Sequence, residues 1–227
     1  MQDSCYQLAS KPDDVRVVFY LNDDDERLED YQTPSKSVKI IGPDQPTAKS
    51  WNDLSRVAMG DSSADIFILG GDDAVFETNS WDYSLRDKAN NVSDGVFCVG
   101  FNDGIKRDST PHVAVGRGYI EALGYFVNPM FLHWYVDTWT VELTRSVERY
   151  FYAEDIVFKH NTPKATGKVD NTFKRIRSGQ RASWNSRDTT LFDSDFSKRI
   201  MHMEKKVLWD YMLSYSQDER KELKWAV

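Results

Sequence analysis

Short apolar runs that end in turn residues alternate along this chain with segments of helical periodicity. The clearest run is 66–69, in which aliphatic and aromatic residues follow one another without a polar break until Gly70 and Gly71. Such a run is typical of a strand that is buried on both faces of a sheet. The same criteria predict further strands at 15–21, 37–41, 95–100 and 112–116.

Apolar residues recur at helical spacing between several of these strands. In segment 47–59, Trp51, Leu54 and Val57 share one face and Gly60 follows the last turn, as expected for a helix that ends at a glycine. Other helical segments are predicted at 1–10, 119–124 and 140–147, with a surface helix or loop at 76–90.

Strand, helix and strand recur at spacings typical of parallel crossover units, so the predicted fold class is α/β. We expect a Rossmann-like, mixed but mainly parallel sheet flanked by helices over residues 1–158. Segment 159–187 is predicted to be a basic flap or loop. Segment 188–227 is predicted to be an amphipathic helix that packs on the domain, with Asp193 or Ser194 as its cap.

The composition is that of a mildly acidic globular protein. The chain has 227 residues and a net charge of -7, with a pI near 5.2, and no run reaches the roughly eighteen consecutive apolar residues that span a bilayer. Cys5 and Cys98 show no framework spacing, which favours free buried thiols in a reducing compartment. No signal peptide is visible, so we expect a cytoplasmic monomer or weak dimer without membrane contact.

Two adjacent acids follow the strand at 66–69. Gly70 and Gly71 allow a turn or the close approach of a ligand. Asp72 and Asp73 then lie at the carboxyl end of the strand, where open α/β sheets place their binding sites. A metal site and a solvated acidic turn are both consistent with this sequence.

A second acidic run follows the strand at 15–21. It consists of Asn22, Asp23, Asp24 and Asp25. Such a run is either a solvated loop or a ligand contact. Its position directly after a strand matches that of the first acidic pair.

Asp137 lies within the aromatic segment 131–143. An ionised carboxylate in such surroundings requires a partner, because burying it unpaired costs several kcal/mol. The sequence leaves three roles open: an N-cap for the following helix, an ion pair with Arg145 or Arg149, or a catalytic base whose pKa its aromatic neighbours raise.

The order of these motifs resembles a known enzyme family. The chain contains, in this order, Asn22-Asp23-Asp24-Asp25, Trp51-Asn52-Asp53-Leu54, Leu69-Gly70-Gly71-Asp72-Asp73, Trp134-Tyr135-Val136-Asp137 and His160-Asn161-Thr162-Pro163. Together they are similar to the nucleotide-diphospho-sugar glycosyltransferases of the GT-A fold, especially the small family-two-like members often found in phages and other viruses. The resemblance implies a metal-dependent, inverting transfer of a sugar from a nucleoside-diphosphate sugar to a hydroxyl acceptor.

The resemblance also implies roles for individual residues. Asp73 would be a direct ligand of Mn²⁺ or Mg²⁺, since hard carboxylate oxygens suit these cations. His160 would be a further ligand, with a purely structural histidine as the alternative, and Asp137 would take the proton from the acceptor hydroxyl. The donor nucleotide would be contacted by Asn22, Asp23, Asp24, Asp25, Asn52 and Asp72.

Segment 159–187 holds eight basic residues and one acid. It could close over the diphosphate, hold an anionic acceptor such as DNA phosphate, or remain a solvated loop. With the likeness to viral enzymes, it makes a hydroxymethylated base in DNA one candidate acceptor, beside a viral glycan or a protein. A viral enzyme of this kind would act in the cytoplasm of the host cell.

The chain departs from the family pattern at its beginning. Family members open with a strand and a Pro-Thr-Arg-like loop that touches the nucleotide, and this chain starts in what would be the following helix. A missing central strand would expose backbone groups of the sheet and remove part of the donor site. The alternatives are therefore a catalytically silent nucleotide-sugar or nucleic-acid binding module, or a nucleotidyltransferase that attacks phosphorus instead of the anomeric carbon.

Overall fold

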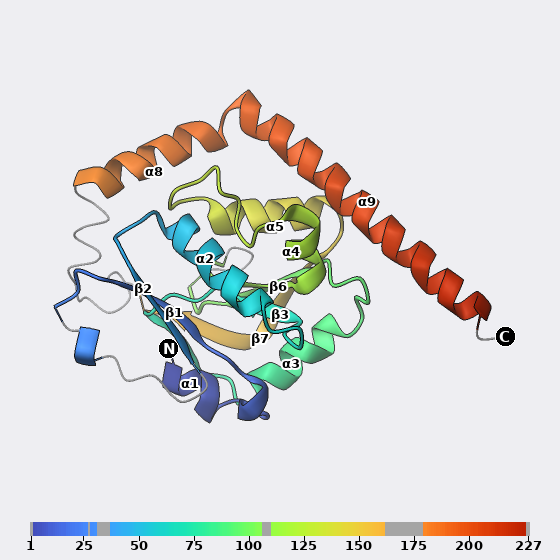
Figure 1. Cartoon of the computed structure of the whole chain (residues 1–227), viewed down its shortest axis with the longest axis horizontal. Coiled ribbons are helices and arrows are strands. Elements are labelled where there is room, and N and C mark those ends of the chain that lie inside the picture. The colour runs from blue at the N-terminus through green and yellow to red at the C-terminus, as the bar shows by residue number, and fades with distance from the viewer. Residues whose placement is uncertain (1, 27, 31–36, 106–109, 162–178, 226–227) are drawn as a thin grey trace.

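The computed structural model of the chain describes residues 2–26, 28–30, 37–105, 110–161 and 179–225, and Figure 1 shows its elements. The helices are α1 (Gln2–Gln7), α2 (Thr47–Met59), α3 (Trp81–Ala89), α4 (Arg117–Leu123), α5 (Val136–Ser146), α8 (Gly179–Phe192) and α9 (Asp195–Trp225), with short 3-10 turns η1 (Pro12–Asp14) and η2 (Leu28–Asp30). The strands are β1 (Val18–Asn22), β2 (Val38–Gly42), β3 (Ile66–Ile68), β4 (Ala74–Phe76), β5 (Cys98–Asn102), β6 (Val113–Gly116) and β7 (Tyr150–His160).

Helices cover both faces of the strand layer (Figure 1). On one face, α2, α4, α5 and α9 contribute to a buried cluster that includes Tyr119 and Trp139. On the other face, α1 and α3 contribute Cys5, Trp81 and Leu85 to a second buried cluster. The α/β class predicted from the sequence is therefore confirmed.

Strand β3 shows why the run at 66–69 contains no polar residue. Phe67 belongs to the cluster on the α2 face, whereas Ile66 and Ile68 pack against the cluster on the α3 face. Because helices cover both faces of the sheet, both sets of side chains must be apolar. The predicted strand is confirmed, but β3 is the outer strand of the five-stranded sheet, and Ile66 and Ile68 are only partly buried.

The five-stranded sheet has the order β3-β6-β5-β7-β4. Only β5 and β7 pair in parallel, while the other three pairs are antiparallel. The expectation of a mixed sheet is confirmed, but the expected majority of parallel pairs is wrong for this sheet. The connection 103–112 between β5 and β6 is shorter than the dozen or more residues that a parallel crossover needs, so β6 returns antiparallel.

Strands β1 and β2 form a separate parallel pair, in register from Val18↔Val38 to Asn22↔Gly42. Helix α2 joins β2 to β3, as a crossover helix does in α/β folds. Strands β1 and β3 do not pair with each other. A groove of about 1400 Å³ lies between them. The strand layer is therefore interrupted at this point.

The sequence predicted neither β4 nor β7. In β7, the charged residues Glu154 and Asp155 interrupt the apolar pattern of the strand. They lie where the register with β5 shifts: Phe101 pairs with Ala153, and Asn102 pairs with Val157. Residues 154–156 bulge out of the ladder; Glu154 and Asp155 are exposed, and Ile156 is buried.

The structure describes only the two ends of the predicted flap at 159–187. Residues up to His160 belong to β7, and the segment from Gly179 belongs to α8. Residues 162–178 lie outside the described residues, so the flap stays a prediction.

Two helices, α8 and α9, replace the single helix expected near the carboxyl end. The Ser194 hydroxyl oxygen accepts the N–H of Ser197 at 3.2 Å, which confirms Ser194 as the cap of α9. Helix α9 packs against α4 and α5 through Leu208 and Met212, and then extends beyond the body of the protein (Figure 1). The expected packing of this region on the domain is confirmed.

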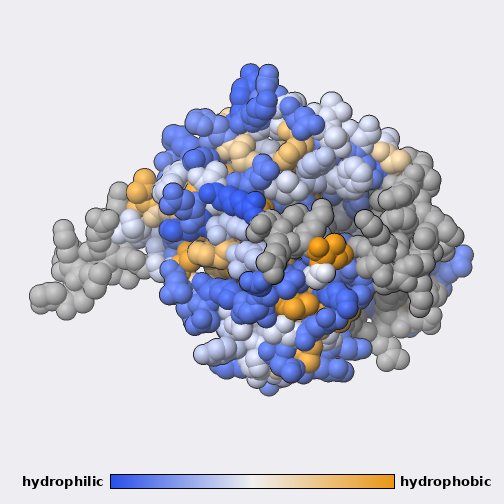
Figure 2. Space-filling model, turned by 180° about the vertical axis from the view of Figure 1, so that it is seen from behind, coloured by the Kyte–Doolittle hydropathy of each residue, from blue (hydrophilic) through white to orange (hydrophobic). Residues whose placement is uncertain are grey.

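The face of the protein opposite to the view of Figure 1 is mainly hydrophilic (Figure 2). Figure 2 shows the face opposite to that of Figure 1, where apolar residues form small patches among polar ones. Within the described ranges, no helix is both long and apolar enough to cross a membrane. Cys5 and Cys98 are buried and free, as predicted.

Candidate metal centre

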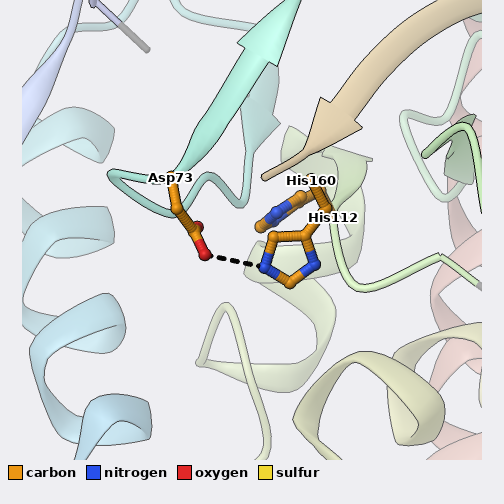
Figure 3. A group of neighbouring side chains, drawn as sticks. All are labelled: Asp73, His112 and His160. Carbon is orange, nitrogen blue, oxygen red and sulfur yellow. Dashed lines mark hydrogen bonds and ion pairs between the residues drawn. The ribbon is translucent and has the colours of Figure 1, made fainter. Parts of the chain in front are cut away.

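Three ligand-type side chains, from the β3–β4 turn, the residue before β6 and the end of β7, meet at one end of the five-stranded sheet (Figure 3). Asp73 lies in the turn between β3 and β4, and His160 is the last residue of β7. Their strands pair so that Ala74 lies opposite His160, and the N–H of Asn161 donates to the Asp73 carbonyl oxygen at 2.9 Å. His112 immediately precedes β6.

The three side chains lie close together. His160 Nε2 and Asp73 Oδ2 are 2.9 Å apart, and the rings of His112 and His160 lie 4.8 Å apart in an edge-to-face arrangement. One ligand atom from each of the three residues can be chosen so that all lie within 4.8 Å of one another. The side chains of Asp73 and His160 are 37% and 23% exposed, so the group is open to solvent on their side.

His112 is the buried member of the group, with 4% of its surface exposed. Both of its ring nitrogens are buried and lack a hydrogen-bond partner among the described residues. An unsatisfied buried polar atom costs about 1–3 kcal/mol and is rare in native proteins, so it requires an explanation. Burial, and secondarily the charge of His160, lowers the pKa of His112 to about 4, so the ring is neutral near pH 7 and can serve as a ligand.

The local structure holds His112 in this position. The Thr110 hydroxyl donates to the His112 carbonyl oxygen at 2.6 Å, and the ring packs 5.1 Å from that of Phe158. Gly71 completes the enclosure, since a Cβ at this position would lie 2.6 Å from Asp73 Oδ1 and 3.3 Å from His112 Cε1. A larger residue here would push the ligand groups apart.

The donor set fits a divalent first-row metal. Two imidazoles and one carboxylate, with positions left open, are typical of catalytic zinc and non-haem iron sites. Metal–ligand bonds of about 2.1 Å place two ligands no more than about 4.2 Å apart, so the group would have to contract slightly around an ion. The imidazoles favour manganese or a later first-row metal over magnesium.

The charges at the site couple His160 to the surrounding acids. The hydrogen bond that His160 donates to Asp73 raises the pKa of His160 against the effect of burial, with further contributions from the charges of Asp73, Asp103 and Asp137. Burial alone would raise the pKa of Asp73, but the hydrogen bond and charge of His160 lower it below its usual range. The metal-free pair is therefore a carboxylate beside an imidazole that is readily protonated.

No protein-family model and no curated protein matches this chain. The functional assignment therefore depends on the geometry of the site and on the order of motifs in the sequence.

The structure narrows the roles that the sequence left open for Asp137. Helix α5 begins at Val136 with Tyr135 in the cap position, so Asp137 lies in the first turn and is not the N-cap. Arg149 pairs with Asp94 at 3.1 Å, and the guanidinium of Arg145 lies over the ring of Tyr150. Neither arginine is paired with Asp137 by these contacts.

The position of Asp137 is compatible with the third role, that of a base. Its carboxylate and the His160 ring are close enough to shift each other's pKa. Burial raises the pKa of Asp137, with a hydrogen bond from the Thr138 backbone acting in the opposite direction. A raised pKa suits a group that accepts a proton near neutral pH, and the assignment stays a prediction.

The side chain that the sequence assigned to the donor at position 52, Asn52, is buried: only 5% of the residue's surface is exposed. Its amide nitrogen donates to the Val127 carbonyl oxygen at 2.8 Å, and its amide oxygen accepts the N–H groups of Phe126 and Val127 at 2.9 and 3.1 Å. These three bonds tie α2 to the segment before α5. The geometry therefore gives Asn52 a structural role, and its predicted contact with the donor gains no support.

The acidic run 22–25 forms the turn after β1, beside the end of β2. The Asp23 N–H donates to the Gly42 carbonyl oxygen at 2.8 Å, and the Asn22 amide donates to Asp44 at 3.3 Å. Asp24 and Asp25 follow in the same turn. Their contact with a nucleotide stays a prediction.

Asp72 is exposed and precedes Asp73 in the turn, but its carboxylate is not part of the three-residue group. Its predicted contact with the ribose or a metal-bound water is untested.

The described basic residues of segment 159–187 make contacts within the protein. Lys159 pairs with Glu77 at 2.9 Å, Arg181 with Asp44, and Arg187 with Asp188 at 3.0 Å. The other basic residues of the segment lie outside the described residues, at positions 164, 168, 174, 175 and 177.

The sequence prediction missed His112. The predicted strand at 112–116 began with this histidine, but a parallel strand would have placed its first residue at the end of the sheet opposite Asp73. Because β6 runs antiparallel to β3, its start lies beside the end of β3: Ala114 pairs with Ile68, and the Leu69 N–H donates to the Val113 carbonyl oxygen at 2.8 Å. The short connection between β5 and β6 was the signal that could have revealed this direction.

Proposed function

We propose that this chain is a metal-dependent glycosyltransferase that moves a sugar from a nucleoside-diphosphate sugar to a hydroxyl acceptor, with inversion at the anomeric carbon. The observation that carries the proposal is the convergence of Asp73 and His160 at 2.9 Å. These two residues are 87 positions apart, and the motif order alone had assigned both to one metal. Their proximity to the buried ring of His112, whose nitrogens lack partners among the described residues, supports a shared metal site.

Asp73, His112 and His160 would hold the cation, for which Mn²⁺ is the best candidate given two imidazole ligands. A bound divalent cation supplies positive charge that stabilises the diphosphate leaving group. Asp137 would receive the proton of the acceptor hydroxyl as its oxygen attacks the anomeric carbon. The acceptor class follows from the resemblance to viral enzymes: a hydroxymethylated base in DNA is one candidate, and a glycan or protein another.

A nucleoside-diphosphate release assay tests this proposal. Purified protein would be incubated with a panel of nucleotide sugars and Mn²⁺, with and without hydroxyl acceptors, and free nucleoside diphosphate would be measured. We expect release that is lost with a chelator and in Asp73→Asn. Asp87→Asn, which alters an exposed acid on α3, is the matched control and should leave release unchanged.

The same assay separates the alternatives. Release of pyrophosphate from a nucleoside triphosphate would indicate a nucleotidyltransferase instead. Binding of a nucleotide sugar without turnover would indicate a catalytically silent binding module, an alternative that the interrupted strand layer between β1 and β3 specifically favours.

A further inference from the structure

The groove between β1 and β3 has the dimensions and walls of a strand position. Residues 15–18 form one side and 65–70 the other, with α2 above and α1 and α3 below. Its volume is about 1400 Å³. The six residues 65–70 correspond to about 20 Å of extended chain, which is the length of an ordinary strand.

The backbone groups that border the groove are oriented for strand pairing. Along β1, Val17 and Phe19 face β2, since the Val17 carbonyl oxygen accepts the N–H of Val38 at 3.0 Å. Alternation then directs the N–H and C=O of Val18 to the opposite edge, toward the groove. Along β3, Phe67 forms backbone hydrogen bonds with β6. The same alternation therefore directs the N–H and C=O groups of Ile66 and Ile68 away from β6.

These outward groups are those of Val18, Ile66 and Ile68. Within the described part of the chain, none of their backbone groups makes a hydrogen bond on the groove side. Two strand edges with unpaired donors and acceptors thus face one another across the groove. Such edges are templates for pairing with another segment of polypeptide.

The side chains of the groove are apolar on both faces of the strand layer. Trp51 and Leu54 of α2 line one face, and Trp81 and Leu85 of α3 line the other. Trp81 and Leu85 are only 3% and 2% exposed, so the α3 side of the groove offers a preformed apolar wall. An extended strand directs its side chains to both faces in alternation, so an apolar strand matches both walls.

The charge along the groove adds a further constraint. Acidic residues outnumber arginines among the lining residues, and Asp13, Asp61 and Asp65 are exposed. A partner with basic residues at the ends of its apolar stretch would complement this charge.

We propose that the groove binds one extended segment of polypeptide from outside residues 1–227, which pairs with β1 on one edge and β3 on the other. The segment has about five apolar residues, with side chains directed to both faces, and basic residues at its ends. It would join the parallel pair and the five-stranded sheet into one continuous sheet.

Amide hydrogen exchange by NMR tests this proposal with the protein as it exists. The probe is the peptide acetyl-Lys-Lys-Val-Ile-Val-Leu-Ile-Lys-amide. At a peptide concentration 100 times its Kd, we expect exchange at Val18, Ile66 and Ile68 to slow about 100-fold. Phe19 and Phe67 are the internal controls, because their N–H groups already pair with β2 and β6 and should change far less.

Two control peptides separate strand pairing from simple apolar binding. One carries N-methyl groups on alternate amides and so keeps its side chains but loses half of its donors. The other replaces every second apolar residue by serine and so loses one apolar face. We expect both to bind at least about tenfold more weakly, since each loses hydrogen bonds or apolar burial worth more than 1.4 kcal/mol.

A variant tests the edge of the groove from the protein side. Val18→Pro removes an N–H that points away from β2, which an edge position tolerates, and should abolish the protection. Val18→Ile is the matched control and should bind as the unchanged protein does.

Several outcomes would overturn the proposal. They are equal binding of the N-methylated peptide, no slowing at the three amides with any peptide, or slow exchange there before peptide is added. The last result in a monomer would show a closed groove, and in a dimer, detected by sedimentation, it would show that a second copy of the chain occupies it.

Discussion

The apparent affinity of the site for Mn²⁺ should depend on pH with a slope of one proton. A metal-bound imidazole must be neutral and a carboxylate ionised. The pKa of His160 is raised above its ordinary value of 6.5 by Asp73, so this ring must lose a proton when the metal binds below that pKa. The pKa of His112 is about 4, and that of Asp73 is below 3.8, so both are already in their ligand forms at pH 5.5.

The magnitude follows from this count of protons. Between pH 6.5 and pH 5.5 the affinity should fall by up to about tenfold, which is about 1.4 kcal/mol. At pH well above the pKa of His160 the affinity should become constant. Isothermal titration calorimetry of the metal-free protein with Mn²⁺ at several pH values, in buffers of different ionisation enthalpy, measures both the affinity and the number of protons released.

Two variants make the expectation specific. His160→Gln should weaken binding and also remove the pH dependence, because the group that titrates is gone. His112→Gln should weaken binding but keep the slope of one. A slope of two in the unchanged protein would show that His112 also titrates in this range, and a slope of zero would show that His160 is not a ligand.

Three further variants probe the site and its support. Asp137→Asn should reduce turnover at least about 100-fold while leaving the Kd of the donor nearly unchanged. Steady-state kinetics and titration with the donor measure the two effects. Full turnover with the acceptor would show that Asp137 is not the base. Gly71→Ala should weaken Mn²⁺ binding about tenfold, because the added methyl group displaces Asp73. The thermal midpoint of unfolding should not change. An unchanged Kd for Mn²⁺ would contradict the close contact between position 71 and the ligand side chains. Asn52→Ala should lower the free energy of unfolding by about 3 kcal/mol in urea titrations, because it leaves buried backbone groups unpaired; a loss below about 1 kcal/mol would refute this structural role.

The sequence was most informative where local pattern and fold agree. The unbroken apolar run at 66–69 predicted β3, since only a strand covered on both faces requires it. The resemblance carried by the order of motifs then predicted Asp73 and His160, which are two of the three candidate ligands.

What the sequence could not predict depends on direction and on partners that are distant in the chain. His112 lies in the site because β6 runs antiparallel to β3. The residues of β6 do not indicate the direction in which the strand runs. Asn52 lies beside the apolar face of α2, but the partners of its amide come from the Phe126–Val127 backbone. Strand β7 was hidden because a bulge places Glu154 and Asp155 in the middle of its apolar pattern.

The candidate metal centre and the groove share β3 but use different parts of it. The centre is built at the end of β3 and from β4, β6 and β7, which are hydrogen-bonded to one another within the five-stranded sheet. The groove uses the opposite edge of β3, where Ile66 and Ile68 direct their backbone groups away from β6. The geometry of the three ligand residues therefore does not require the groove to be filled. If the peptide failed to bind, the proposed metal site would still stand. If the metal failed to bind, the proposed strand site would still stand. Nucleotide binding differs from both, because the acidic run 22–25 follows β1 and Asp73 follows β3, and these two strands belong to separate sheets. A donor that contacted both would bridge the parallel pair and the five-stranded sheet.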